Sequence, residues 1–282
     1  MLDLSLPVLA GPADERIWGE SAGPVRAGAY TLFQGESGLA GFAVAAVDAD
    51  LEQAAGELYR QLFALTAGLN FYRIWNYVPA INARVSGLEN YRRFCRGRSL
   101  AFEENFGPGF PSHLPAASAV GSATGPLALG FVAGRAPARY HENPRQLPAF
   151  EYPREYGPRP PSFSRATVVE TGRGRQIFIS GTASIRGHLT VAPHDLDGQL
   201  ACTLENLRLI AAAAGGPRGL EGGAGRQRSF KVYLRHAGDF FRARACLDRA
   251  LFAPDDSVSY LNASICRSDL LVEIEATLTD AG

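Results

Sequence analysis

The chain has 282 residues, and 28 lysines and arginines balance 28 aspartates and glutamates, so its formal net charge at pH 7 is zero. Proteins that coat nucleic acids or membrane surfaces gain affinity from a basic excess, so this balance argues against both classes. Lys231 is the one lysine among the 28 basic residues, which leaves 27 arginines and excludes lysine chemistry at every other position. A GC-rich genome and a demand for planar, bidentate anion binding both explain such an excess of arginine.

The cysteines and histidines give no sign of a metal centre. Cys95, Cys202, Cys246 and Cys266 show no CxxC spacing, so the chain resembles neither a zinc ribbon nor a disulfide framework. The five histidines are scattered along the chain. No apolar run approaches the ~18 residues of a membrane span. We therefore expect a reduced, cytoplasmic protein of one large domain or two ordinary ones.

Two helical patterns occupy corresponding places in the two halves of the chain. Apolar residues recur at steps of three and four over 51–65 and over 196–211, and each run follows an aspartate that can cap a helix, Asp50 and Asp195. Two short strand-like runs precede each helix. Each half then continues with an alternating strand, a second helix and two closing strands, and the sequence predicts them at these ranges: 73–78, 91–95 and 127–132 in the first half, then 230–235, 240–251, 259–266 and 270–277 in the second.

The order β-β-α-β-α-β-β therefore appears twice, which indicates an internal duplication. Between the halves lies a proline- and arginine-rich segment over 136–162. Proline fixes φ and removes a backbone donor, so this segment is expected to be extended and to stay out of helices and central strands. The predicted organisation is an N-terminal half over 1–135, the connecting segment over 136–162 and a C-terminal half over 163–282. The glycine-rich run over 215–225 lacks the GK[ST] ending of a phosphate-binding loop and is predicted to be a surface loop.

A carboxylate stands inside an apolar strand near the C-terminus. The strand period of two places Leu271, Glu273 and Glu275 on one face of the 270–276 segment. Partial desolvation raises the pKa of such a carboxyl group and makes a protonated, acid-donating form plausible near neutral pH. The alternative is that both glutamates line a solvated face or pair with arginines.

Arginines and small residues suggest a place for a small anion. The arginines gather in the connecting segment and after it, together with Tyr152 and Tyr156, and they would suit an aromatic-friendly ligand with one or two carboxylates: Arg145, Arg154, Arg159, Arg165, Arg235 and Arg267. A solvated arginine-rich coil explains the same residues equally well. After a predicted strand, the turn over 180–184 (SGTAS) has the small residues that let a backbone approach a ligand closely.

Six segments together resemble the chorismatases, also called chorismate hydrolases. They are RIWNYVPAIN (73–82), ENYRRFCRGRSLAF (89–102), NPRQLPAFEYPREYGPRPPSFSRA (143–166), FISGTASIRGH (178–188), FKVYLR (230–235) and ASICRSDLLVEIEA (263–276). The C-terminal half also resembles the YjgF-like reactive-intermediate deaminases. The resemblance implies an α+β protein of two YjgF-like (chorismate-mutase-like) halves, with helices on one face of each sheet.

The resemblance also implies removal of pyruvate from chorismate without a metal or organic cofactor. The glutamate matching Glu273 would protonate the methylene carbon of the enolpyruvyl ether. Protonation would create an oxocarbenium centre. Either water would then add to this centre, or the neighbouring ring hydroxyl would displace the side chain. The substrate-binding candidates carried over from the motifs are Arg145, Tyr152, Arg154 and Arg235.

Two positions bear on the ring product. Cys266 matches the cysteine of hydroxybenzoate-forming members and could assist rearomatisation by moving a proton, whereas Ala183 looks more like the hydrolytic type. We expect 3-hydroxybenzoate, with 4-hydroxybenzoate or a dihydroxycyclohexadiene carboxylate as the other outcomes.

Two other functions remain open at this point. One is a YjgF-like imine or enamine deaminase, although the region over 257–260 lacks the arginine which that class has before the matching glutamate. The other is a non-catalytic small-molecule-binding protein, which would have no need of an acid inside an apolar strand. The expected partner is the small-molecule substrate, with no nucleic acid and no membrane, in a monomer that is pseudo-oligomeric by duplication or in a trimer.

Overall fold

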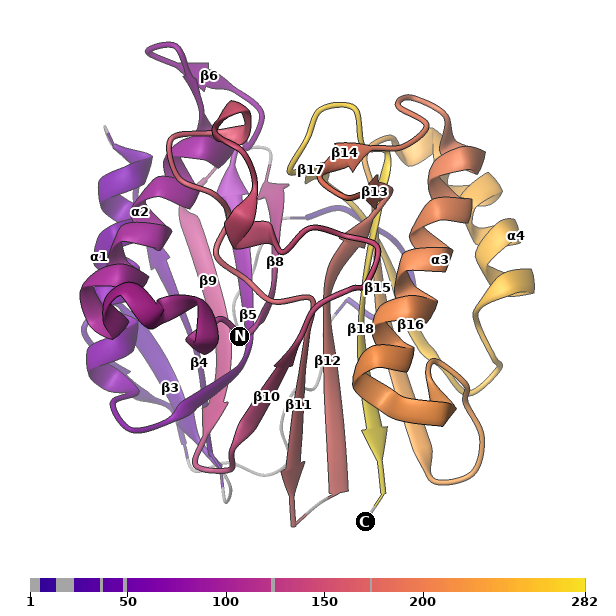
Figure 1. Ribbon diagram of the computed structural model, residues 1–282, viewed down its shortest axis with the longest axis horizontal. Coiled ribbons are helices and arrows are strands. Elements are labelled where there is room, and N and C mark those ends of the chain that lie inside the picture. The colour runs from indigo at the N-terminus through magenta and orange to yellow at the C-terminus, as the bar shows by residue number, and fades with distance from the viewer. Residues whose placement is uncertain are drawn as a thin grey trace.

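Two seven-stranded sheets pack face to face in the computed structural model, and helices cover the outer side of each (Figure 1). The structure describes residues 6–13, 23–35, 38–47, 50–122, 125–172 and 174–281. Part of the predicted 1–135 half therefore lies outside the described residues. The apolar layer between the sheets includes Tyr72, Trp75, Val132, Phe178 and Tyr233, so each sheet buries both of its faces. No helix in these ranges is both long and apolar enough to cross a bilayer.

The N-terminal half contains the first copy of the repeated order. Its elements are β2 (Val25–Ala27), β3 (Tyr30–Gln34), β4 (Gly38–Ala45), α1 (Leu51–Leu65), β5 (Asn70–Pro79), the hairpin β6 (Arg84–Val85) and β7 (Leu88–Glu89), α2 (Asn90–Phe106), a 3-10 helix (Gly107–His113), β8 (Ala116–Ser122) and β9 (Leu127–Gly134). Asp50 caps α1 as predicted, because its side chain accepts hydrogen bonds from two backbone N–H groups of the first turn.

The C-terminal half repeats this order with a longer first helix. Its elements are β11 (Ala166–Thr171), β12 (Gly174–Ala183), the hairpin β13 (Ile185–Arg186) and β14 (Leu189–Thr190), α3 (Leu196–Gly215), a 3-10 turn (Gly216–Arg218), β15 (Arg226–Leu234), a 3-10 turn (Ala237–Asp239), α4 (Phe240–Ala250), β16 (Ser257–Asn262), β17 (Ser264–Ile265) and β18 (Val272–Asp280). Asp195 caps α3, as its spacing predicted.

The two sheets have the same topology. Their strand orders are β17-β8-β5-β9-β4-β3-β2 and β1-β16-β15-β18-β12-β11-β10. In both sheets one central pair is parallel, β5 with β8 and β15 with β16, and the other main pairs are antiparallel. The predicted duplication of β-β-α-β-α-β-β is therefore confirmed.

The halves exchange their outermost strands. β1 (Val8–Ala10), from the N-terminal end, pairs with β16 of the C-terminal sheet, and β17 pairs with β8 of the N-terminal sheet. The single strand predicted over 259–266 is thus wrong, because the chain leaves one sheet after Asn262 and enters the other at Ser264. Each exchanged strand covers an edge that would otherwise expose unpaired backbone groups.

The connecting segment over 136–162 is mostly extended but not featureless. It contributes the edge strand β10 (Ala138–His141) to the C-terminal sheet and makes two 3-10 turns, Ala149–Glu151 and Arg154–Tyr156. Its place at the sheet edge agrees with the expectation that prolines keep it out of central strands.

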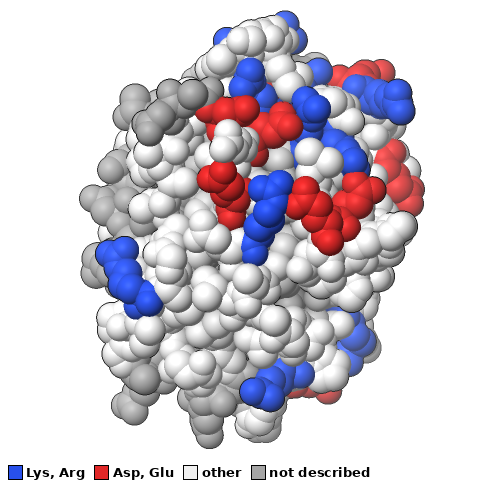
Figure 2. All heavy atoms as spheres, turned by 90° about the vertical axis from the view of Figure 1, so that its left-hand side faces the viewer, with Lys and Arg blue, Asp and Glu red and all other residues white. Residues whose placement is uncertain are grey.

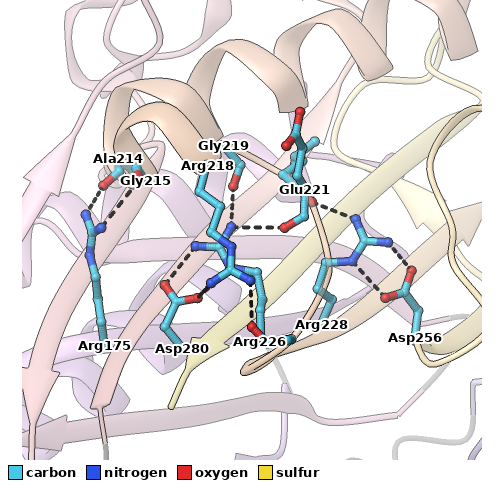
Figure 3. Close-up of polar contacts among 12 residues, drawn as sticks. Arg175, Ala214, Gly215, Arg218, Gly219, Glu221, Arg226, Arg228, Asp256 and Asp280 are labelled. Atoms are coloured by element: carbon cyan, nitrogen blue, oxygen red, sulfur yellow. Dashed lines mark hydrogen bonds and ion pairs between the residues drawn. The ribbon is translucent and has the colours of Figure 1, made fainter. Parts of the chain in front are cut away.

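Buried arginines hold the glycine-rich segment that follows α3 (Figure 3). Arg226 pairs with Asp280 at 2.6 Å and donates to the Gly219 carbonyl at 2.7 Å. Arg228 pairs with Asp256 and donates to the Leu220 carbonyl at 2.6 Å. The predicted surface loop over 215–225 is confirmed only from Gly219 onward, because Gly215 ends α3 and Gly216–Arg218 form a 3-10 turn. This loop is anchored to the sheet through its carbonyl groups.

The outer face of α1 and α2 carries basic and acidic side chains next to one another (Figure 2). Three ion pairs connect α1, or the aspartate that caps it, to α2: Arg60 with Glu104, Arg93 with Asp50, and Arg96 with Glu52. Because the signs alternate, this helical face presents no patch of a single charge.

Close contact between α1 and α2 depends on Gly97. A Cβ at this position would overlap the carbonyl oxygen of Glu52. We predict that Gly97→Ala forces the helices apart and lowers the free energy of unfolding by about 1–3 kcal/mol, measured by urea denaturation. Gly109→Ala is the control, because nothing lies within 4 Å of its Cβ position. Equal stability of the two variants would contradict this packing.

Candidate active site

A pocket lies between the two halves and draws its walls from both. The N-terminal half supplies side chains of α2 and β8, and the C-terminal half supplies β12, β18 and the loop between β17 and β18. The connecting segment closes one side. The residues of this central pocket are Glu89, Tyr91, Arg92, Phe94, Cys95, Arg98, Ala117, Ser118, Ala119, Tyr152, Tyr156, Pro161, Phe163, Arg165, Gly181, Ala183, Ile185, Cys266, Arg267 and Glu273.

Glu273 on β18 is a buried carboxyl group that reaches the central pocket. It is 4% exposed, and no hydrogen bond or ion pair to it is found among the described residues. Burial, followed by the negative charge of Glu275, raises its pKa from 4.5 to about 8, although Arg73 and Arg165 act in the opposite direction. The group is therefore protonated at neutral pH.

Gly181 makes room for this carboxyl group. A Cβ at Gly181 would overlap Oε1 of Glu273, and it would also crowd the Ser118 side chain at 3.2 Å. The turn predicted over 180–184 is wrong, because residues 180–183 belong to strand β12. Their small side chains allow the backbone of β12 to approach Glu273 itself, whereas the sequence suggested that they admit a ligand.

Glu275, two residues further along β18, is equally buried but fully paired. It accepts hydrogen bonds from Arg73 at 2.6 Å, from the Trp75 indole at 2.8 Å and from Lys231 at 3.0 Å. Burial raises its pKa, but Lys231 and Arg73 outweigh that effect and lower the pKa to about 2. The alternative of pairing with basic side chains therefore holds for Glu275, whereas Glu273 has no such partner among the described residues and a raised pKa.

The placement of Leu271 on the same face was wrong. Strand β18 begins at Val272, and Leu271 lies before it and packs into the C-terminal core with Val272 and Ile274. The alternation that sets Glu273 and Glu275 on one face begins only where the strand begins.

Guanidinium groups in the central pocket retain free donors. Nε and Nη2 of Arg98, Nε of Arg165 and Nη2 of Arg267 are buried and have no hydrogen-bond partner among the described residues. Arg98 is 2% exposed and stacks on the rings of Tyr59 and Phe102, and among the described residues no carboxylate forms an ion pair with it. A buried, unpaired arginine is costly, so this arrangement suits an anionic ligand.

Two thiols and the Tyr91 phenol of the pocket stay neutral. Burial, reinforced by the charge of Glu273, raises the pKa of Cys266 to about 12. Burial likewise raises the pKa of Cys95 to about 12, and it holds the pKa of Tyr91 well above 10. Cys266 is therefore a thiol beside the acid and not a thiolate nucleophile. Among the described residues, no three His, Cys, Asp or Glu side chains gather where they could hold a metal ion.

Of the seven candidate residues, four line the central pocket: Glu273, Cys266, Tyr152 and Ala183. The other three, Arg145, Arg154 and Arg235, are not among its lining residues. Arg145 is half exposed and pairs with Glu205. Arg235 donates to the carbonyls of Leu270, Ile265 and Arg267, so it fixes the loop that carries Cys266.

Arg98 was not among the predicted site residues, although it lies in the segment 89–102 that resembles the chorismatases. Arg98 lies on α2 on the same side as Phe94, Cys95 and Phe102, all of them buried. A charge inside an apolar helical stripe was the signal that could have identified it.

Comparison with known proteins matches this architecture. A family model described as chorismatase FkbO/Hyg5-like, N-terminal, matches residues 18–133. A chorismatase from Streptomyces rapamycinicus is 40% identical over 252 residues, which are 84% of this chain and 74% of that protein. The crystal structure of a chorismatase superposes with a TM-score of 0.84 at 34% identity, covering 92% of this chain and 80% of that one. The chain belongs to the chorismatase family.

Two further members of the chorismatase family come from Streptomyces hygroscopicus. A 3-hydroxybenzoate synthase is 42% identical over 219 residues, or 73% of this chain, and a chorismatase is 40% identical over 231 residues, or 79% of this chain. These matches cover 63% and 66% of the two relatives, so the chain spans just under two thirds of their length.

The buried acid predicts an unusual pH dependence of stability. The folded protein keeps the proton of Glu273 between pH 4.5 and about 8, whereas the unfolded chain releases it. Stability therefore falls as pH rises through this interval, by up to about 1.4 kcal/mol per pH unit. We predict that Glu273→Gln has a higher Tm than the unsubstituted protein at pH 8 and that the difference shrinks toward pH 5.

Scanning calorimetry across this pH range measures the difference. The surface variant Glu57→Gln should follow the unsubstituted protein at every pH. If the Tm of Glu273→Gln also equalled that of the unsubstituted protein at every pH, the Glu273 carboxyl group would be ionised in the folded state and the prediction would be wrong.

Proposed function

We propose that this chain cleaves chorismate to pyruvate and a ring product, chiefly 3-hydroxybenzoate, with Glu273 as the acid. One observation carries the proposal: a buried carboxyl group that holds its proton to about pH 8 faces a pocket with free arginine donors. Membership in the chorismatase family supports chorismate as the substrate.

Glu273 would act on the enolpyruvyl ether of the substrate. Its carboxyl proton passes to the methylene carbon, and the adjacent ether carbon becomes an oxocarbenium centre. A neutral acid is needed for this step, because a carboxylate has no proton to give. Burial keeps the acid neutral at the pH of the cell.

Two routes then release pyruvate. If water adds to the oxocarbenium carbon, the products are pyruvate and a dihydroxycyclohexadiene carboxylate. If the neighbouring ring hydroxyl displaces the side chain, no water is consumed, and the atoms of chorismate divide between pyruvate and 3-hydroxybenzoate. Cys266 beside Glu273 supports the second route, because its thiol can pass its own proton to the Glu273 carboxylate left by the first step and take up the ring proton in exchange. The relative named 3-hydroxybenzoate synthase supports it as well.

Arginines would bind the two carboxylates of the substrate. Arg98 lies on the α2 side of the central pocket, while Arg165 and Arg267 lie on the side formed by the C-terminal half. Arg165 also donates to the Tyr152 hydroxyl at 2.9 Å, and Arg267 stacks on the Tyr156 ring at 4.2 Å. Cations contributed by both halves of the chain suit a ligand with two carboxylates. We therefore propose Arg98, Arg165 and Arg267 as the binding residues in place of Arg145, Arg154 and Arg235.

The test is incubation with chorismate. Pyruvate is followed through coupled lactate dehydrogenase, and NMR identifies the ring product. We expect pyruvate and 3-hydroxybenzoate in equal amounts, and a loss of about 100-fold or more in kcat for Glu273→Gln. Glu57→Gln should keep full activity. Absence of pyruvate would refute the function, and full activity of Glu273→Gln would refute the role of the acid.

Arg98 offers a second test, on substrate binding. Arg98→Gln removes a charge-assisted interaction with a carboxylate, so kcat/KM should fall about 10- to 100-fold, mainly through KM. Arg96→Gln, two residues earlier on the exposed side of α2, is the matched control and should leave both constants unchanged. Equal KM values in the two variants would remove Arg98 from the binding site.

A further inference from the structure

We propose that Glu275 is a positioning residue that withholds two buried cations from Glu273 and so keeps Glu273 a proton donor. This inference rests on the proposed function, because it explains how the acid retains its proton. It assigns a task to Lys231, the one lysine of the chain, and to Arg73 and Trp75, none of which lines the central pocket.

The geometry places the two carboxyl groups under different influences. Glu273 and Glu275 share a face of β18, and that face looks toward the N-terminal sheet. Lys231 stands directly opposite Glu275 on the neighbouring strand β15, whereas Tyr233 stands opposite Glu273. Arg73 and Trp75 reach across from β5 of the other sheet and also bond to Glu275. Three side-chain donors of this layer therefore converge on Glu275, and none of them bonds to Glu273.

The charges around Glu273 show how Glu275 helps it to keep its proton. Arg73 and Lys231 carry two positive charges, and Glu275 cancels one of them. Without Glu275, both cations would remain buried with Glu273 as the nearest carboxyl group along β18. Opposite charges at short range in a buried site strongly favour the ionised form, so Glu273 would lose its proton. Arg73 already acts in this direction.

The other groups that face Glu273 do not titrate in the same range. Cys266 and Tyr91 remain neutral to high pH. Glu142, whose pKa burial raises to about 7, pairs with Arg165 at 3.8 Å. The titration of Glu273 must therefore be followed on the signal of its own carboxyl group, which separates it from the titration of Glu142.

Three variants change the net charge around Glu273 in known steps. From a net charge of +1 for Arg73, Lys231 and Glu275, Glu275→Gln gives +2, Lys231→Met gives 0, and the double variant returns to +1. Gln keeps the shape of Glu275 and an acceptor for Trp75. We expect the pKa of Glu273 to fall by about one unit or more in Glu275→Gln, to return toward the original value in the double variant, and to stay or rise in Lys231→Met.

The primary measurement is a ¹³C NMR titration of carboxyl-labelled protein without substrate, with the Glu273 signal assigned by its absence in Glu273→Gln. The second is the pH dependence of kcat, whose loss at high pH should move with the same pKa. The NMR result stands even if chorismate is not the substrate, so failure of the proposed function remains distinguishable. An unchanged Glu273 pKa in Glu275→Gln, or a fall of equal size in Lys231→Met, would overturn the proposal.

If Glu275→Gln alone does not fold, the double variant and Lys231→Met still decide the matter. If Arg73, Lys231 and Glu275 had only a structural role, the double variant and Lys231→Met would each lower kcat by the same factor at all pH values. Our proposal predicts that the pH at which activity is lost is conserved in the double variant and is not lowered in Lys231→Met. A lowered value in both would contradict it.

Discussion

Burial of two carboxyl groups on one face of β18 is the constraint on which the rest of the site depends. A buried carboxylate is stable only when cations and hydrogen bonds replace the water that it loses. Glu275 receives three donors from two sheets and ionises, whereas Glu273 receives none and keeps its proton. The same strand therefore holds one carboxyl group with a lowered pKa, Glu275, and one with a raised pKa, Glu273. The two differ only in the side chains that the neighbouring strands place beside them.

The duplication explains why the site lies where it does. Two sheets of the same topology pack face to face, and their shared interior supplies both the cations of Glu275 and the dry surroundings of Glu273. The central pocket opens at the end of this interior, where α2 of one half meets the β17–β18 loop of the other. Exchange of β1 and β17 ties the halves together. The loop that carries Cys266 begins directly after β17, so the exchange also positions part of the pocket.

The many arginines divide into groups with different physical roles. Some hold loops through backbone carbonyls, as Arg226, Arg228 and Arg235 do, and others form exposed pairs that contribute little. A few are buried with donors to spare, and Arg98 is the clearest of these. The zero net charge therefore conceals a local excess of positive charge around the pocket. The burial of each arginine and its number of unsatisfied donors distinguish these roles, whereas the amino-acid composition cannot.

The sequence by itself determined the duplicated order of elements, the two capping aspartates and the acidic character of the strand that carries Glu273, because periodicity and capping are local properties. Strand periodicity alone could not tell the two glutamates apart, and only the family resemblance pointed to Glu273. The difference between their pKa values depends on Arg73 and Lys231, which lie 202 and 44 residues away from Glu275 in the chain. The sequence also favoured Arg145, Arg154 and Arg235 over Arg98, because proximity to a motif says nothing about the direction of a side chain. Only the packing of the two sheets decided which charges are buried together, and electrostatic effects in a dry interior follow distance in space and not in sequence.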